Sequence, residues 1–198
     1  MKRIVIVFVL IISCFYSYGQ STEVKNMLKE IEGQWSLDDN GNVTYQRIME
    51  IPEMKKDDIY NRVLNYFVYN YGSGKSVIQT QDKELGQIIG KGIYDRLHTF
   101  SNGSGWVYLG TWHIVRVDIK DGKARIIITL TEYSEDYKGS LSSSNVSQEF
   151  PINKDGGRKN IMGKSFYKSH IKAMASLDLI EKAIKEGTTS KKIEDDKW

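Results

Sequence analysis

The 198-residue chain has a single cysteine, Cys14, and only two prolines. Cys14 lies close to the N-terminus, inside a segment that is expected to be cleaved off. The rest of the chain has no thiol to form a disulfide, to act as a nucleophile or to ligate a metal. So few prolines leave long uninterrupted segments for helices and strands. The stability of the protein must therefore come from a packed hydrophobic core.

The chain also lacks a strong excess of either charge. Its formal net charge is +3, from 28 basic and 25 acidic residues. The first 19 residues contain Lys2 and Arg3 but no acid, so the remainder has 26 basic residues against 25 acidic ones and a net charge of +1. Recognition of nucleic acid depends on concentrated lysine and arginine. This balance argues against a nucleic-acid partner.

The N-terminus has the order of a secretory signal peptide. Two basic residues precede an apolar run from Ile4 to Ile12, which is shorter than the ~20 apolar residues of a membrane span. The small residues Ser17 and Gly19 stand two positions apart before Gln20, so we expect cleavage after Gly19. The mature protein would begin at Gln20, would have no transmembrane span, and would act in the periplasm or outside the cell.

A lipoprotein is the alternative. Ile11-Ile12-Ser13-Cys14 resembles a lipoprotein box, in which Cys14 would be acylated and would hold the protein on a membrane. The residues that follow, from Phe15 to Tyr18, are mostly aromatic and unlike a polar tether. Removal of Cys14 with the signal peptide is therefore the main expectation.

Hydrophobic periodicity predicts an α+β protein. Alternation from Val43 to Ile51 predicts a strand, and an apolar face from Ile59 onward predicts a helix that begins near Lys56. Asp121-Gly122 tolerates the positive φ of a tight turn and joins two β-rich runs, which predicts a hairpin. The further predicted strands cover residues 76–81, 85–100, 106–120 and 123–133.

Further elements are expected on both sides of residues 43–133. Residues 20–41 are expected to form an N-terminal helical extension, capped at Ser21 or Thr22. Residues 134–160 are rich in serine and are predicted as a polar loop. An amphipathic helix is expected over 161–187 and a disordered charged tail over 188–198.

One strand of the predicted hairpin carries the candidate binding residues. Alternation places Trp112 and Asp118 on one face, expected to face solvent, and His113 and Val115 on the other, expected to face the core. Aromatic side chains can line a groove or stack on a sugar, and they also fill cores. The candidate contacts with a ligand or partner are Trp106, Tyr108 and Trp112.

No catalytic, cofactor-binding or metal-binding residue is predicted. The three histidines, His98, His113 and His170, lack the paired spacing of a metal site and are expected to be ordinary strand or surface residues. The run from Gly72 to Ser76 follows a predicted helix, whereas a phosphate-binding loop follows a strand and precedes a helix. No serine lies in Gly-x-Ser-x-Gly.

Several of these segments together resemble a known family. They are the strand 43–51, the helix start Lys56-Asp57-Asp58-Ile59-Tyr60, the turn Asp82-x-Glu84 with Gly90-Lys91-Gly92, and the Asp121-Gly122 hairpin. Over about residues 42–133 the chain is similar to a domain-of-unknown-function family of exported bacterial proteins with a TATA-binding-protein-like (TBP-like) fold. The resemblance implies a curved antiparallel sheet of about five strands, packed with helices in β-α-β-β-β-β order, and no established activity.

These observations together favour an exported, non-catalytic binding or interaction module of the bacterial cell envelope. Its expected partner is another envelope protein or a small apolar or glycan ligand, and no cofactor is expected. One alternative is a hydrolase of envelope material with a dispersed site. Another is a lipocalin-like carrier, because Gly33-Gln34-Trp35 resembles the opening of such barrels.

Overall fold

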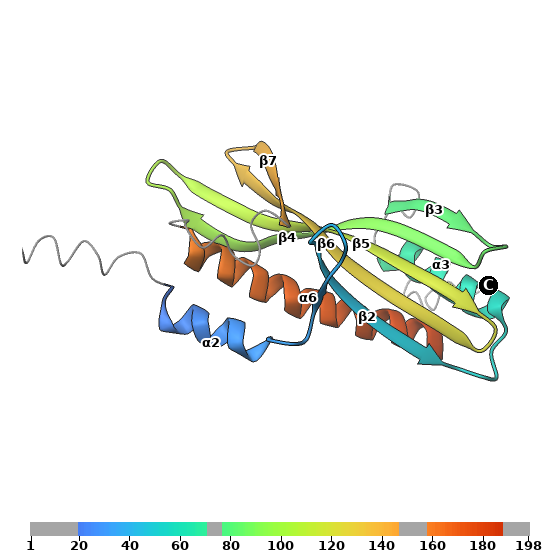
Figure 1. Cartoon of the computed structure of the whole chain (residues 1–198). Helices are drawn as coiled ribbons and strands as arrows, with labels where there is room; N and C mark the ends of the chain where they lie inside the picture. Colours follow the sequence, from blue (N-terminus) through green and yellow to red (C-terminus); the bar gives the residue numbers. More distant parts are fainter. Residues whose placement is uncertain (1–19, 71–76, 147–157, 188–198) are drawn as a thin grey trace, which may run out of the picture.

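The computed structural model describes residues 20–70, 77–146 and 158–187 (Figure 1). The predicted signal peptide with Cys14, the run from Gly72 to Ser76 and the tail 188–198 lie outside the described residues. In the described ranges, three helices lie on one side of a seven-stranded antiparallel sheet. None of the helices in these ranges is long and apolar enough to cross a membrane.

The sheet has a long central hairpin with shorter strands on either side. Its strands follow the order β1-β2-β6-β5-β4-β3, and β7 pairs with β6 beyond the end of β2. Thus β2 lies along one half of β6, up to Leu130, and β7 lies along the other half, from Glu132 to Tyr137. The strands are β1 (Ser36–Leu37), β2 (Val43–Glu50), β3 (Ile78–Asp82), β4 (Gln87–Ser101), β5 (Trp106–Lys120), β6 (Lys123–Tyr137) and β7 (Ser140–Asn145).

The predicted β-α-β-β-β-β order is confirmed from β2 to β6, with α3 (Lys56–Asn70) after the first strand. The predicted hairpin is also confirmed, because Asp121-Gly122 joins β5 to β6 with Gly122 at φ 65°. The Asp121 carboxylate accepts a hydrogen bond from the backbone N–H of Lys56 at 2.8 Å. The hairpin turn therefore also satisfies an otherwise unpaired donor at the start of α3.

Helix α3 packs on β4 and β5 and against α6 (Lys159–Glu186). A Cβ on Gly90 would lie 2.5 Å from Cε1 of Phe67, so the absence of a side chain on β4 makes room for this buried ring. The apolar side chain of Val68 is 45% exposed, whereas Tyr66 is buried. Val68 stands nine residues after Ile59, about two and a half turns, which places it on the opposite side of the helix.

Helix α6 runs along the sheet and contacts β2, β4, β5 and β6 (Figure 1). The predicted range, 161–187, is close to the observed one. Gly187 follows the last residue of α6 and has φ 84°. The N-terminal extension docks on this helix through α2 (Thr22–Glu30). Ser21 caps α2 by accepting a hydrogen bond from Val24 N–H at 3.3 Å, and its own N–H donates to Asn160 Oδ1 at 2.7 Å.

Three predictions about the fold need correction. Residues 134–160 are not one loop, because β6 continues to Tyr137, β7 follows at Ser140–Asn145, and α6 begins at Lys159. The N-terminal extension is not wholly helical, because it includes β1. With β1 and β7, the sheet has seven strands and not about five. Backbone pairing with neighbouring strands outweighs the weak strand propensity of these polar segments. Residues 147–157 lie outside the described ranges.

The sheet is open. Its strand order ends at β3 on one side and at β1 and β7 on the other. A lipocalin-like barrel requires the sheet to close on itself. That alternative is therefore wrong for this chain.

Candidate functional site: the open face of the sheet

The two faces of the sheet differ in what covers them. On β5, Val115, Val117 and Ile119 are buried beneath the helices. The residues between them point to the opposite side, because successive side chains of a strand alternate. We call this opposite side the open face. Its residues on β5 are Trp106, Tyr108, Gly110, Trp112, Ile114, Arg116, Asp118 and Lys120.

Strand register places side chains from neighbouring strands next to these β5 residues on the open face. At one end, Trp112 lies between Glu132 of β6 and Ile93 of β4, and Tyr108 lies between Asp136 and Thr99. We call this region the aromatic end. At the other end, Asp118 lies between Arg125 of β6 and Gln87 of β4, close to the Asp121-Gly122 turn. We call that region the hairpin end.

The aromatic end combines exposed rings with cations. Trp106 is 60% exposed, while Tyr108 and Trp112 are half-buried. The ammonium group of Lys91 lies 4.9 Å from the centroid of the Trp112 ring and 3.6 Å from Oε1 of Glu132. The guanidinium of Arg96 lies 4.9 Å from the centroid of the Tyr108 ring. Such cation–π contacts hold a charge and a ring in a fixed relative position.

A bulge in β4 positions Arg96. The register of β4 against β5 shifts between Tyr94 and His98, and Arg96 within the bulge has φ 48°. This left-handed conformation is unfavourable for a residue with a side chain. A Cβ on Gly110 would lie 2.9 Å from the carbonyl oxygen of Tyr94, so glycine on β5 allows the bulge to approach closely. A strained backbone thus places a cation on the open face.

Asp118 joins three strands at the hairpin end. Its carboxylate accepts hydrogen bonds from Gln87 Nε2 at 2.9 Å, from Arg116 Nε at 2.8 Å and from Arg125 Nη2 at 2.6 Å. Burial acts to raise the pKa of Asp118, but the hydrogen bonds from Arg116, Gln87 and Arg125 outweigh it and the pKa is lowered. Asp118 therefore stays ionised and is a poor proton donor at neutral pH.

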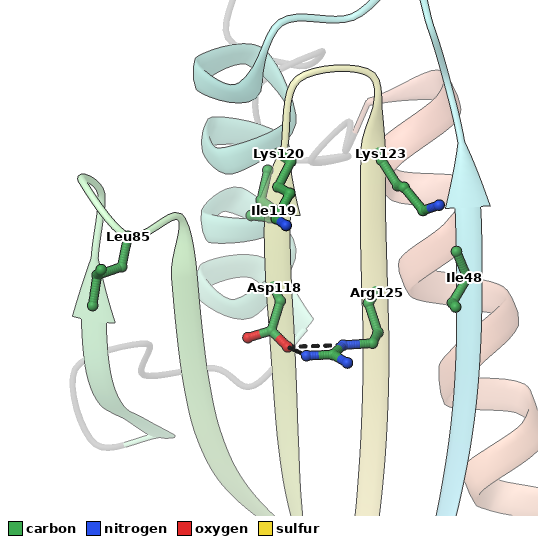
Figure 2. Close-up of a pocket in the computed structure, with 7 residues that line it drawn as sticks. All are labelled: Ile48, Leu85, Asp118, Ile119, Lys120, Lys123 and Arg125. Atoms are coloured by element: carbon green, nitrogen blue, oxygen red, sulfur yellow. Dashed lines mark hydrogen bonds and ion pairs between the residues drawn. The ribbon is translucent and has the colours of Figure 1, made fainter.

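A hollow of about 250 Å³ opens on this part of the face (Figure 2). Figure 2 shows Leu85 and Ile48 on opposite sides of the β5–β6 hairpin, with the Asp118–Arg125 pair between them. The hollow is lined by Ile48, Leu85, Asp118, Ile119, Lys120, Lys123 and Arg125. It therefore combines aliphatic and cationic side chains.

The structure brings the three candidate contact residues, Trp106, Tyr108 and Trp112, together on one strand and one face. Alternation along β5 already predicted that Trp112 and Asp118 share a face. Sequence reasoning missed Lys91, Arg96 and Arg125, because their positions depend on the register between strands and on the β4 bulge. Single-sequence periodicity contains no information on either.

Two histidines belong to the core and not to the open face. His113 and His170 are buried between the sheet and α6, which corrects the expectation of a surface position for His170. The Tyr94 ring stacks on His113 with centroids 3.9 Å apart. Burial lowers the pKa of His113 to about 4 and also lowers the pKa of His170. In the ranges that the structure describes, no group of His, Cys, Asp and Glu side chains is arranged to hold a metal ion.

An antiparallel sheet with helices on one face and an open second face defines a two-layer α+β domain. Residues 45–134 match the family model described as a domain of unknown function (DUF4468) with TBP-like fold, and this part of the chain belongs to that family.

Two solved structures share the fold. A DUF4468 family protein from Bacteroides ovatus is 15% identical, with a TM-score of 0.56 over 80% of this chain and 95% of that one. A TBP-like protein from Parabacteroides distasonis is 14% identical, with a TM-score of 0.53 over 76% of this chain and 97% of that one. The comparison with curated proteins found no match.

Proposed function

We propose that the protein is an exported, non-catalytic glycan-binding module of the bacterial cell envelope, and that the aromatic end of the open face is its binding surface. One observation carries this proposal. Trp106, Tyr108 and Trp112 lie in a row on the open face, while the described helices all lie on the other side of the sheet. Rings of this kind pack against the apolar faces of sugars.

The polar surroundings of the rings favour a glycan over an apolar ligand. Register places Glu132 of β6 and Asn145 of β7 beside Trp112, and the exposed Ser143 of β7 lies further along, opposite the buried Ser134. Hydroxyl, amide and carboxylate groups beside an aromatic ring can hydrogen-bond the hydroxyl groups of a sugar. An envelope protein is the competing partner.

The non-catalytic part of the proposal is supported by the state of the titratable groups. A hydrolase would be favoured by a carboxylic acid or a histidine with a suitably shifted pKa in a cleft. Asp118 faces the hollow, but its lowered pKa disfavours proton donation. His113 and His170 are buried under α6, away from the open face.

Export rests on the N-terminal sequence, where two basic residues precede an apolar run and small residues precede Gln20. The polar groups around the aromatic end are also compatible with binding to glycans of the cell envelope.

The mature protein is first screened for binding on a glycan array. Co-sedimentation with insoluble polysaccharides that contain the recognised glycans then tests the proposal. Trp112→Ala and Tyr108→Ala should each weaken retention by roughly tenfold, because a stacked ring contributes on the order of 1 kcal/mol or more. Tyr69→Ala is the matched control, because Tyr69 is an exposed aromatic residue on α3, on the helical side. Equal retention of all variants, or capture of a defined envelope protein without any glycan, would contradict the proposal.

A further inference from the structure

The hairpin end of the open face concentrates positive charge. Lys120 and Lys123 are direct cross-strand partners on either side of the turn, and like charges directly opposite one another destabilise a sheet. Glu50 pairs with Lys123 at 3.1 Å. Among the described residues, Lys120 forms no ion pair. The carboxylate of Asp121, in the turn, accepts a hydrogen bond from the backbone N–H of Lys56, and among the described residues it forms no ion pair with either lysine.

The two arginines at this end are held in place by one carboxylate. Asp118 binds Arg116 through Nε and binds Arg125 through Nε and Nη2. A guanidinium has five N–H donors, so both side chains retain donors for another acceptor. Both remain close to half exposed, and one carboxylate neutralises only one of the two charges. An arginine fixed in this way is preorganised to bind a second anion.

Aliphatic side chains flank this charge. Ile48 is 52% exposed and Leu85 is 74% exposed, and both line the hollow with Arg125 (Figure 2). Leu85 is held in its turn, because its backbone N–H donates to Asp82 Oδ1 at 2.8 Å and Gly86 follows at φ 70°. An exposed aliphatic side chain beside a cationic cluster fits a ligand that has an apolar body and an anionic group, and Ile48 is the one that lies directly opposite Arg125.

We propose that this hollow binds a small aliphatic anion, with the anionic group on Arg125 and Lys120 and the aliphatic body against Ile48, the direct cross-strand neighbour of Arg125. The hollow of about 250 Å³ has room for a short-chain anion. Hexanoate has this size and this chemistry. The inference does not depend on the glycan proposal, which concerns the aromatic end of the face.

Titration of the ¹⁵N-labelled mature protein with sodium hexanoate, followed by NMR, tests the inference. We expect saturable shifts in the Nε–H signals of Arg116 and Arg125 and in the backbone amides around the hairpin turn. Hexanamide has the same shape without the charge and should cause no comparable shifts. Inorganic phosphate supplies the charge without the aliphatic body and should bind more weakly than hexanoate.

Variants locate the site. Lys120→Gln and Arg125→Gln should each weaken hexanoate binding by roughly tenfold, because each removes a charged donor. Lys120→Gln should also raise the melting temperature of the free protein, because it removes one of two opposed like charges. Arg96→Gln makes the same charge change at the aromatic end and should leave hexanoate binding unchanged. Equal binding of hexanamide, equal binding of phosphate, or equal weakening by Arg96→Gln would overturn the inference.

Discussion

At the scale of single residues, His113 couples the packing of α6 to pH. The side chain is 1% exposed and lies against the Tyr94 ring. The Tyr94 hydroxyl donates to Ser176 Oγ of α6 at 2.9 Å. Burial lowers the pKa of His113 from 6.5 to about 4, so the folded protein keeps this imidazole neutral where the unfolded chain is protonated.

This shift predicts that acid destabilises the fold. Between about pH 6.5 and about pH 4 the unfolded state binds more protons than the folded state, so the free energy of unfolding falls as the pH falls through that window. The full effect is roughly 3 kcal/mol, from about 1.4 kcal/mol for each pKa unit. Urea unfolding across this window measures it.

His113→Gln should flatten the pH dependence of stability more than His98→Gln does. His98 is only partly buried, at the outer part of β4. An unchanged pH dependence in His113→Gln would show that other groups, such as His170, dominate acid unfolding.

The sequence predicted which face of β5 a residue occupies, but it did not predict the contacts between strands. Alternation along β5 separated His113 and Val115 from Trp112 and Asp118, because one-sided burial imposes a period of two. The cation–π partners of the aromatic rings were not predictable, because Lys91 and Arg96 come from β4 and depend on its bulge.

At the scale of elements, Arg62 joins the two helices that cover the sheet. Its guanidinium, on α3, donates to the backbone carbonyl oxygens of Ile184 and Lys185 at 2.7 Å each. The last carbonyl groups of a helix have no partner within it, and they carry the negative end of the helix dipole. Arg62 therefore stabilises the end of α6 from a neighbouring element.

Arg62→Ala should lower the free energy of unfolding by about 1–3 kcal/mol, because it leaves two carbonyl groups without their charged donor. Chemical denaturation of the purified protein measures the change. Lys182→Ala is the control, because Lys182 is an exposed residue of the same helix end with only a 3.8 Å ion pair to Glu186. Similar losses in the two variants would contradict the capping role.

The elements with strong periodicity or a defined turn were predicted well. The Asp121-Gly122 hairpin and the two long helices are examples. The strands β1 and β7 were missed for a physical reason. Ser140–Asn145 has five polar residues out of six and one exposed leucine, so its strand conformation comes from pairing with β6 and not from its own sequence.

At the scale of the whole molecule, export is a prediction about the mature N-terminus. Protein recovered from the envelope of its own cells should begin at Gln20 and have no attached lipid. Cys14→Ser should leave this processing unchanged, whereas it would block processing of a lipoprotein. Intact-mass spectrometry of both forms measures the start site, and an acylated N-terminal Cys14 would establish the lipoprotein alternative instead.

The asymmetry of the molecule is the basis of the functional proposal. Helices α2, α3 and α6 lie on one side of the sheet (Figure 1). The other side presents the aromatic end and the hairpin end, of which Figure 2 shows the second. A protein that binds through this open face should be covered there, and only there, in its native setting.

Hydroxyl-radical footprinting tests this claim most directly. Mass spectrometry measures the oxidation of each side chain in the intact cell envelope and in the purified protein, and the two are compared. The account predicts that Tyr108 and Trp112 are oxidised less in the envelope than in the purified protein, while Tyr69 on α3 is oxidised equally in both. Unchanged oxidation of Tyr108 and Trp112, together with protection of Tyr69, would place the binding surface on the helical side and contradict the account.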